Sequence, residues 1–381
     1  MKTKTIFKFI ASLAVGMCLG LLLAAVAIAL FTDITMERFM HNLRTLEIGE
    51  TVFAAVMGIV MFVLCMLIQI IGHEGGHLVG GLLTGYRFVS FRIFSLTLLR
   101  REGRWTLRRF SLAGTGGQCI MTPPDGPTDR LPFVIYNAGG VVFNLFTVLL
   151  AIAAAAAHPG HLSGLQLMFL IMLGLSGAFA FILNGIPMTS AGMPNDAHNI
   201  MTLWRHPESR RHFALQLRVN ALAQDGMRLR DMPDEWFEDD LTTPPCNLLH
   251  TVTRTIIASR LLDEGHTEEA HDVLTAINTD GDKMPRLITC ELRSELIYTS
   301  LALGRVEDAA RMLTPTLRQY IERSAAFMSS KQRVLCAMAL RMDNDRGKAE
   351  DILHRVESQR GKYVIEGEVT MDIDLMHKLL A

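Results

Sequence analysis

The segment His73-Glu74-Gly75-Gly76-His77 carries the side chains of this sequence whose types and spacing best suit chemistry. Residues four apart share one face of an α-helix, so the imidazoles of His73 and His77 can bind one metal ion. Glu74 lies one position further round and can act on a water that the metal binds. We therefore predict that His73 and His77 bind Zn2+ and that Glu74 is a general base in peptide-bond hydrolysis.

The sequence around this motif is apolar. Residues 51–71 contain no charge, and apolar sequence resumes at 78–83. Ionisable groups inside an apolar membrane helix are costly unless they have partners, and they commonly mark functional sites. The alternative is a polar cluster among lipid headgroups at a helix end. Apolar residues continue beyond the motif, which would place Glu74 ~16 Å before that end and favours a metal site.

Half of the 381 residues are apolar, which indicates a membrane protein with a soluble part. Four runs are long enough for transmembrane helices, at residues 9–31, 51–83, 131–157 and 162–187. The first run also suits a signal peptide, although it exceeds the usual apolar core of about 7–15 residues. The last two runs are joined by a short turn and should form an antiparallel pair.

Positive charge predicts the orientation of these spans. Lysines precede the first run, and eight arginines lie between Tyr86 and Arg130. Both segments are therefore expected on the cytoplasmic side, with cytoplasmic N- and C-termini, in a multi-pass protein of the cell membrane. The net charge of −1 and the absence of basic clusters interleaved with aromatic residues exclude nucleic-acid binding. The six cysteines are scattered singly, which predicts neither a disulfide framework nor a thiolate zinc site.

A third zinc ligand is expected after the fourth run, because a catalytic zinc usually takes three protein ligands and one water. The polar stretch 184–198 cannot face lipid and should line a cavity or be covered by protein. Asp196 is the first acidic residue after Asp129, and His198 is its rival. A carboxylate would complete the usual set of two histidines and one acid.

Over roughly residues 50–205 the chain resembles the site-2 protease family of intramembrane zinc metalloproteases. Three motifs carry the resemblance: the helix with His73 and His77, the stretch from Asn137-Ala138-Gly139-Gly140 to Asn144, and Asn184-x-x-Pro187 followed by an aspartate. The resemblance implies that His73, His77 and Asp196 bind zinc and that Glu74 is the general base. Asn144 and Asn184 either bind the substrate backbone or oxyanion, or form hydrogen bonds between helices.

The segment between the second and third runs is predicted to contain a β-hairpin. Residues 88–96 and 105–110 have strand composition and are joined across 101–104. In the resembled family, β-structure beside the site is thought to hold the substrate extended, which fits capture of a peptide at a strand edge. The glycines at 113–117 lack a nucleotide-binding spacing and are expected to form a turn.

The C-terminal part is predicted to be a soluble helical domain at 246–381, after an acidic connector at 206–245. Gly265, Gly304 and Asn344 each precede an alanine by five residues, and a leucine follows that alanine by four. Gly and Asn suit the left-handed end of a helix. This pattern resembles a short tetratricopeptide-like array, which would bind a peptide or protein partner; a helical bundle without such a role is the alternative.

These features predict a mainly α, polytopic membrane protein with four transmembrane helices, a small β-hairpin insertion and a soluble repeat-like domain. Residues 1–50 would hold the first helix and an external loop, and residues 51–205 the catalytic core. The expected activity is zinc-dependent hydrolysis of a membrane-associated protein or peptide near the cytoplasmic face of the bilayer. The alternative is an inactive membrane scaffold or peptide-binding adaptor that works through its helical repeats.

Overall fold

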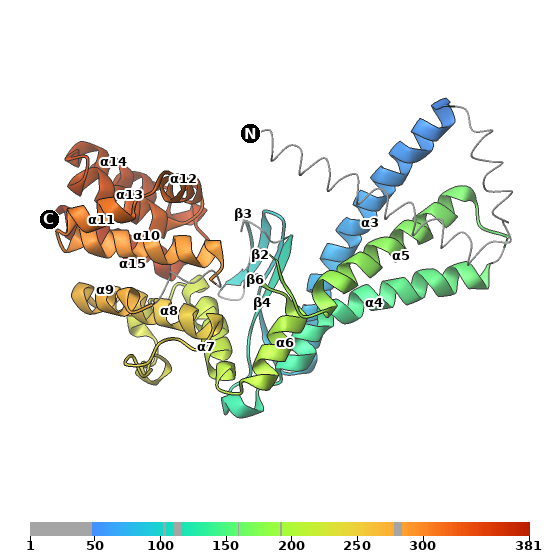
Figure 1. Cartoon of the computed structure of the whole chain (residues 1–381), viewed down its shortest axis with the longest axis horizontal. Coiled ribbons are helices and arrows are strands. Elements are labelled where there is room, and N and C mark those ends of the chain that lie inside the picture. The colour runs from blue at the N-terminus through green and yellow to red at the C-terminus, as the bar shows by residue number, and fades with distance from the viewer. Residues whose placement is uncertain (1–47, 102–103, 110–115, 159, 191–192, 278–283) are drawn as a thin grey trace. The chain divides into compact units, whose positions relative to one another are not determined.

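The computed structural model describes residues 48–101, 104–109, 116–158, 160–190, 193–277 and 284–381 (Figure 1). The predicted first span at 9–31 lies outside these residues, as does most of the predicted glycine turn. The described part is mainly helical, about 70%, with thirteen α-helices and a small antiparallel sheet. The chain divides into two compact units, one of residues 1–76 and 140–186 and one of 77–139 and 187–381. The predicted core range 51–205 contains residues of both units.

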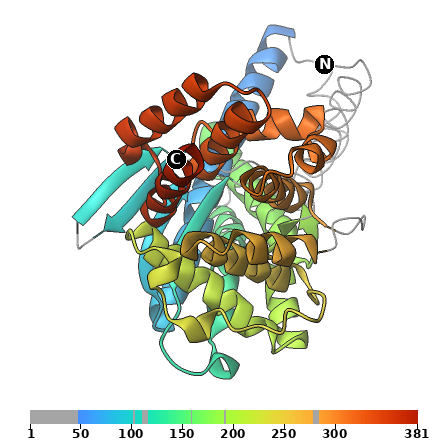
Figure 2. The same cartoon turned by 90° about the vertical axis from the view of Figure 1, so that its left-hand side faces the viewer.

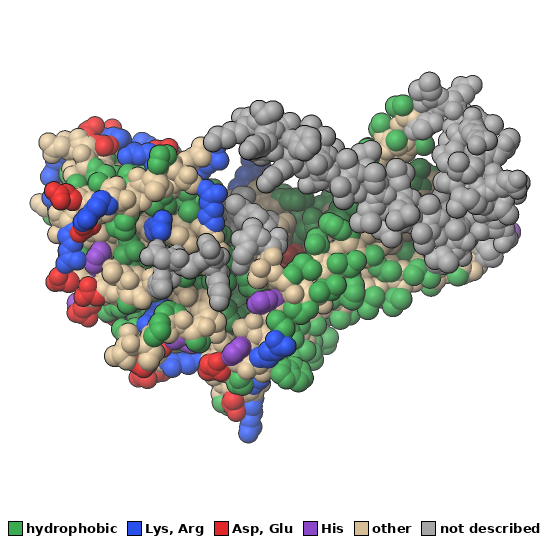
Figure 3. All heavy atoms as spheres, viewed as in Figure 1, with side chains coloured by type: hydrophobic (Ala, Val, Ile, Leu, Met, Phe, Trp, Pro, Cys, Tyr) green, Lys and Arg blue, Asp and Glu red, His purple; other side chains and the backbone are tan. Residues whose placement is uncertain are grey.

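The first unit consists of apolar helices. Helix α3 spans Ile48–Leu83, α4 spans Phe133–Ala157 and α5 spans Gly164–Gly185. Each of them is long and apolar enough to cross a membrane. Large apolar side chains such as Phe53 and Phe146 remain exposed on them, and Figure 3 shows a broad hydrophobic surface there. Three of the four predicted spans therefore correspond to suitable helices.

Glycines allow these helices to pack closely. A Cβ at Gly72 would lie 1.9 Å from the Phe143 ring of α4, so only hydrogen fits there. Helices α3 and α4 therefore approach each other closely at this position. Gly185 of α5 faces Val141, whereas Gly174 faces Ala151. The opposite order of these contacts along α4 and α5 confirms their antiparallel pairing.

The second unit contains a four-stranded antiparallel sheet of order β3-β2-β1-β4. The strands are β1 Arg87–Ile93, β2 Leu96–Arg101, β3 Arg104–Arg109 and β4 Gly117–Thr122. The single strand predicted for 88–96 is wrong in extent, because the chain turns at Phe94, whose φ is 51°. The hairpin of β2 and β3 is confirmed, and β4 is an additional strand that pairs with β1.

The segment 206–245, predicted as a connector, contains a helix and two 3-10 turns, and it follows a short hairpin and another helix. A short hairpin of β5 Thr189–Ser190 and β6 Met193–Pro194 leads into α6 Asp196–Arg205. Helix α7 then spans Ser209–Gln224 and is followed by two 3-10 turns, Leu229–Asp231 and Asp234–Trp236. Ala221 of α7 packs on Val89 and Ile120 of the sheet. Burial against the sheet explains why this polar-looking segment is helical.

The remaining helices stack in antiparallel pairs from α8 to α15 (Figures 1 and 2). Their bounds are α8 Leu248–Glu264, α9 Thr267–Thr275, α10 Arg286–Ala302, α11 Val306–Met312, α12 Pro315–Ser324, α13 Ser329–Arg341, α14 Arg346–Ser358 and α15 Glu366–Leu380. The predicted repeat is visible in the backbone, since Gly265, Gly304 and Asn344 all have positive φ. The alanines five residues later, Ala270, Ala309 and Ala349, are fully buried. The expected helix-pair pattern is therefore confirmed.

Helix α13 carries two buried cations that bind carboxylates of its neighbours. Lys331 Nζ lies 2.8 Å from Glu291 Oε2 of α10. Arg333 Nη2 lies 2.6 Å from Glu295 Oε2 of α10, and its Nε lies 2.6 Å from Asp372 Oδ1 of α15. These bonds satisfy charges that would otherwise be costly inside the domain, and they join three helices at one point.

Candidate metal centre

His77 is fixed by a backbone carbonyl from the start of α4. Its Nδ1 lies 2.8 Å from Tyr136 O. A carbonyl can only accept, so Nδ1 carries a proton, and in the neutral ring Nε2 then has the lone pair. The Tyr136 hydroxyl donates to Cys119 O at 2.8 Å and the ring stacks on Tyr86, with ring centroids 4.7 Å apart. Tyr136 is thereby anchored in a hydrophobic core, and its carbonyl sets the tautomer of His77.

Asp196 reaches His77 from the first turn of α6. Its Oδ2 lies 3.4 Å from His77 Nε2. Asn195 caps this helix, because its Oδ1 accepts from His198 N at 2.9 Å and from Met188 N at 3.2 Å. Leu203 of α6 is completely buried in the same core as Tyr136. The cap and this apolar anchor together determine where Asp196 lies.

His73 is oriented by an amide network that links all three apolar helices. Gln69 Nε2 donates to Leu173 O at 3.3 Å, so Gln69 Oε1 faces Asn144, whose Nδ2 donates to it at 2.9 Å. Asn144 Oδ1 is left to accept from His73 Nδ1, at 2.7 Å. Because each step fixes the next, Nδ1 of His73 carries a proton, and Nε2 is the nitrogen on which the neutral ring has its lone pair. Thr147 adds a hydrogen bond to Gln69 Oε1 at 3.1 Å.

Gly140 on α4 makes room for the His73 ring. A Cβ at this position would lie 2.6 Å from three atoms of that ring. The imidazole is therefore held from two sides, by Asn144 through a hydrogen bond and by the backbone of Gly140 through contact. The absence of a side chain at Gly140, in the predicted Asn137-Ala138-Gly139-Gly140 element, is therefore explained by the space that the His73 ring needs.

Helix α3 runs without a break from His73 to His77, and the two imidazoles are one turn apart on it. The candidate ligand atoms of His73, His77 and Asp196 all lie within 4.8 Å of one another. Glu74 follows His73 directly and is 9% exposed. Two imidazoles and one carboxylate form a donor set that suits Zn2+ and leaves a position for water.

The other candidates from the sequence are placed differently. Asn184 Nδ2 donates to Ala180 O of its own helix at 3.1 Å. Asn144 is fully buried and engages both His73 and Gln69, so the structure favours its hydrogen bonding between helices over contact with a substrate. His198 contributes its backbone N–H to the α6 cap, and its side chain does not belong to the three-residue ligand group.

Two residues that orient the histidines were not singled out from the sequence. Gln69 is an uncharged polar residue one turn before His73 in an apolar run, and that spacing could have indicated it. Tyr136 acts through its main-chain carbonyl, which no sequence pattern identifies. Comparison of the chain with protein-family models, curated proteins and solved structures gave no match. The functional argument therefore rests on the site itself.

Proposed function

We propose that the chain is a membrane-embedded zinc metalloprotease, in which His73, His77 and Asp196 hold the metal and Glu74 is the general base. The observation that carries the proposal is the hydrogen bonding of the two imidazoles. Nδ1 of each ring donates to an oxygen, Asn144 Oδ1 or Tyr136 O. Metal-binding histidines characteristically have such partners, which fix the tautomer and leave Nε2 for the metal.

A bound zinc would polarise the scissile carbonyl and lower the pKa of a coordinated water toward ~7. Glu74 accepts a proton from the attacking water, whose oxygen adds to the carbonyl carbon. The C–N bond then breaks, and Glu74 returns the proton to the leaving nitrogen. Its low exposure suits this role, because exclusion of bulk water strengthens the electrostatic interactions in the site.

The substrate class follows from the surroundings of the motif. Helix α3, which carries both histidines, is one of the three helices with the length and hydropathy of a membrane span. A peptide bond within reach of such a helix belongs to a membrane-associated protein or peptide. Its helix must unwind locally before a carbonyl becomes accessible to attack, and the free edge of a strand suits capture of an extended segment.

Metal content is the direct test of the ligand set. The detergent-purified protein should contain one zinc per chain by mass spectrometry. Glu74→Gln should retain it, whereas His77→Ala and Asp196→Ala should lose it. His198→Ala is the matched control for Asp196→Ala and should retain zinc. An unmodified protein without zinc, or loss of zinc in His198→Ala but not in Asp196→Ala, would overturn the assignment.

Proteolysis is tested separately, in cells that express either the unmodified chain or Glu74→Gln. Membrane-protein fragments that appear with the unmodified chain and are absent with Glu74→Gln would support the enzyme. If zinc is bound normally and the two fragment patterns are identical, the chain is instead a scaffold or adaptor. Deletion of the repeat domain would then abolish its partner interactions, whereas Glu74→Gln would not.

A further inference from the structure

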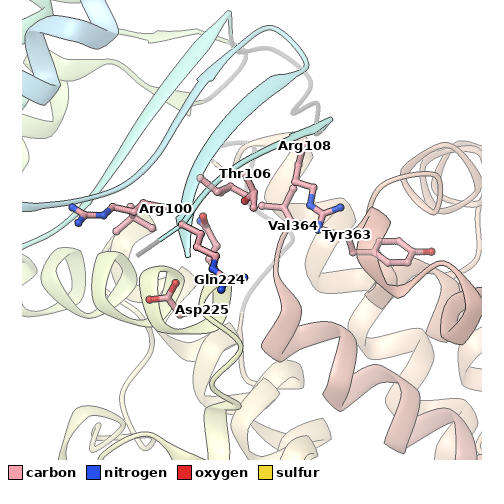
Figure 4. Close-up of a pocket in the computed structure, with 10 residues that line it drawn as sticks. Arg100, Thr106, Arg108, Gln224, Asp225, Tyr363 and Val364 are labelled. Carbon is pink, nitrogen blue, oxygen red and sulfur yellow. The ribbon is translucent and has the colours of Figure 1, made fainter. Parts of the chain in front are cut away.

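Two adjoining clefts in the second unit lie between the outer strand β3 and the segment that precedes α15. The first has a volume of about 180 Å³ and is lined by Val89, Leu99, Arg100, Arg104, Thr106, Arg108, Gln224, Asp225, Tyr363 and Val364 (Figure 4). The second, of about 500 Å³, is lined by Ser95, Leu107, Arg108, Arg109, Ala326, Phe327, Gly361 and Lys362. Both clefts share Arg108, and neither includes a residue of the candidate metal centre.

Strand alternation brings two arginines and a hydroxyl to one face of β3. Arg104, Thr106 and Arg108 are two residues apart and therefore point to the same side. Thr106 pairs with Leu99 of β2, which is buried. Arg100 lies on the other face, with its guanidinium carbon 5.9 Å from the Trp105 ring, and Figure 4 shows it directed away from Arg108.

Among the described residues, Arg104 and Arg108 lack the carboxylate partners that some arginines of the unit have. Arg254 and Arg260 each bind a carboxylate. Arg104 and Arg108 make no ion pair or hydrogen bond within the part of the chain that the structure describes. Asp225 is the single carboxylate among the residues that line the two clefts. The clefts therefore carry an excess of positive charge, which favours an anion.

The first cleft also contains a buried amide. Gln224, at the end of α7, is 6% exposed, and its Nε2 donates to Asn220 Oδ1. Its Oε1 has no hydrogen-bond partner among the described residues. A buried acceptor without a donor is costly, and a hydroxyl of a bound molecule could supply one. The cleft thus combines donors for an anion with an acceptor for a hydroxyl group.

We propose that this cleft binds a phosphate monoester with a small hydroxylated organic group. Guanidinium groups bind phosphate oxygens by paired hydrogen bonds, and two of them match the two negative charges of the monoester. The phosphate lies on Arg104 and Arg108 with the Thr106 hydroxyl as a further donor, and the organic group lies toward Gln224. A phosphate monoester is offered by a soluble phosphorylated metabolite, which can also supply the hydroxyl group, and by the anionic lipid phosphatidic acid, which supplies the phosphate alone.

Such a ligand would contact three segments that are far apart in the sequence: β3, the end of α7 and residues 363–364. Binding to the folded arrangement stabilises it by mass action. A rise in melting temperature with ligand concentration is therefore expected, independently of any proteolytic activity or of zinc.

The test uses the full chain in phosphatidylcholine nanodiscs. In one arm glycerol 3-phosphate is titrated and followed by calorimetry. In the other, phosphatidic acid is incorporated into the nanodiscs and the melting temperature is measured. Arg108→Ala should weaken the binding of glycerol 3-phosphate at least about tenfold, as expected when a charge-assisted hydrogen bond is lost, and should reduce the rise in melting temperature caused by phosphatidic acid. Arg108→Lys keeps the charge but removes the planar guanidinium that forms paired hydrogen bonds, and it should give an intermediate loss of affinity.

Arg130→Ala is the matched control, because Arg130 is exposed and lines neither cleft. Its binding should equal that of the unmodified chain. An effect confined to glycerol 3-phosphate identifies a soluble ligand, and one confined to phosphatidic acid identifies a headgroup; either supports the phosphate site. The proposal is overturned if neither probe binds, if Arg108→Ala binds normally, or if Arg130→Ala loses as much affinity as Arg108→Ala.

Discussion

Replacing Gly140 by alanine should damage the candidate metal centre although Gly140 is not itself a ligand. The new methyl group would lie 2.6 Å from the His73 ring, about 0.8 Å short of the 3.4 Å at which ordinary contact begins. If the ring moves by that distance away from Gly140, the 2.7 Å bond from Nδ1 to Asn144 can lengthen to about 3.5 Å, which is longer than an ordinary hydrogen bond of about 2.7–3.2 Å. If instead the helices separate, overpacking costs about 1–3 kcal/mol.

The size of the effect depends on whether the His73 ring moves or the helices separate. Loss of the partner that orients a metal-binding histidine lowers metal affinity by about 10–100-fold. Zinc affinity should be measured by competition with a chelator, and the melting temperature of the metal-free protein in parallel. We expect Gly140→Ala to lower zinc affinity within that range, or to lower the melting temperature if α3 and α4 move apart.

Gly174→Ala is the matched control within the same group of helices. A Cβ there lies 3.6 Å from Ala151 Cβ, which is an ordinary contact. Alanine is also the better helix former, by about 1 kcal/mol, so stability should be unchanged or slightly higher. Unchanged zinc affinity together with an unchanged melting temperature in Gly140→Ala would refute the packing of His73 described above.

Three further outcomes are expected. Asn144→Ala should lower zinc affinity about 10–100-fold in chelator competition, whereas Asn184→Ala, whose amide bonds only its own helix among the described contacts, should not. Arg333→Met strands buried carboxylates and should lower the free energy of unfolding by about 3–5 kcal/mol in urea titrations, against about 0–1 kcal/mol for the exposed Arg346→Met. Burial and the neighbouring Asp372 carboxylate raise the pKa of Glu368 to about 7, from 4.5. The folded state then holds a proton that the unfolded chain releases, so stability should fall by up to about 3 kcal/mol as the pH rises from 4.5 through 7. Glu368→Gln should reduce this slope in melting curves, and the remaining slope comes from Asp372, whose pKa is also raised by burial.

The parts of the site that depend on local geometry could be predicted from the sequence. The four-residue spacing of His73 and His77 determines their shared face on a helix, whatever surrounds them. The positive φ values at Gly265, Gly304 and Asn344 also follow from local rules, since few residue types adopt that conformation readily. Asp196 was predicted from an expected ligand set and a motif order, and the structure places its carboxylate beside His77.

The features that were missed depend on contacts between distant segments. Strand β4 is six residues long and pairs with β1 across an intervening hairpin, so its own sequence gives little indication of it. Helix α7 was not predicted, because its buried side includes polar residues such as Ser209, His212 and Gln224. Such residues look like a solvated connector until packing against the sheet is known. The amide network at His73 could not be predicted for the same reason, because it depends on how three helices pack together.

The buried ion pairs of α13 have a consequence for the size of the helical domain. Repeat arrays can usually gain or lose units, because each unit contacts only its neighbours through apolar surfaces. Here Arg333 binds Glu295 on one side and Asp372 on the other, so both neighbouring helices must be present to neutralise it. Duplicating or deleting a helix pair at this point would bury a charge without a counterion. The association of α10, α13 and α15 is therefore constrained by electrostatics as well as by apolar packing.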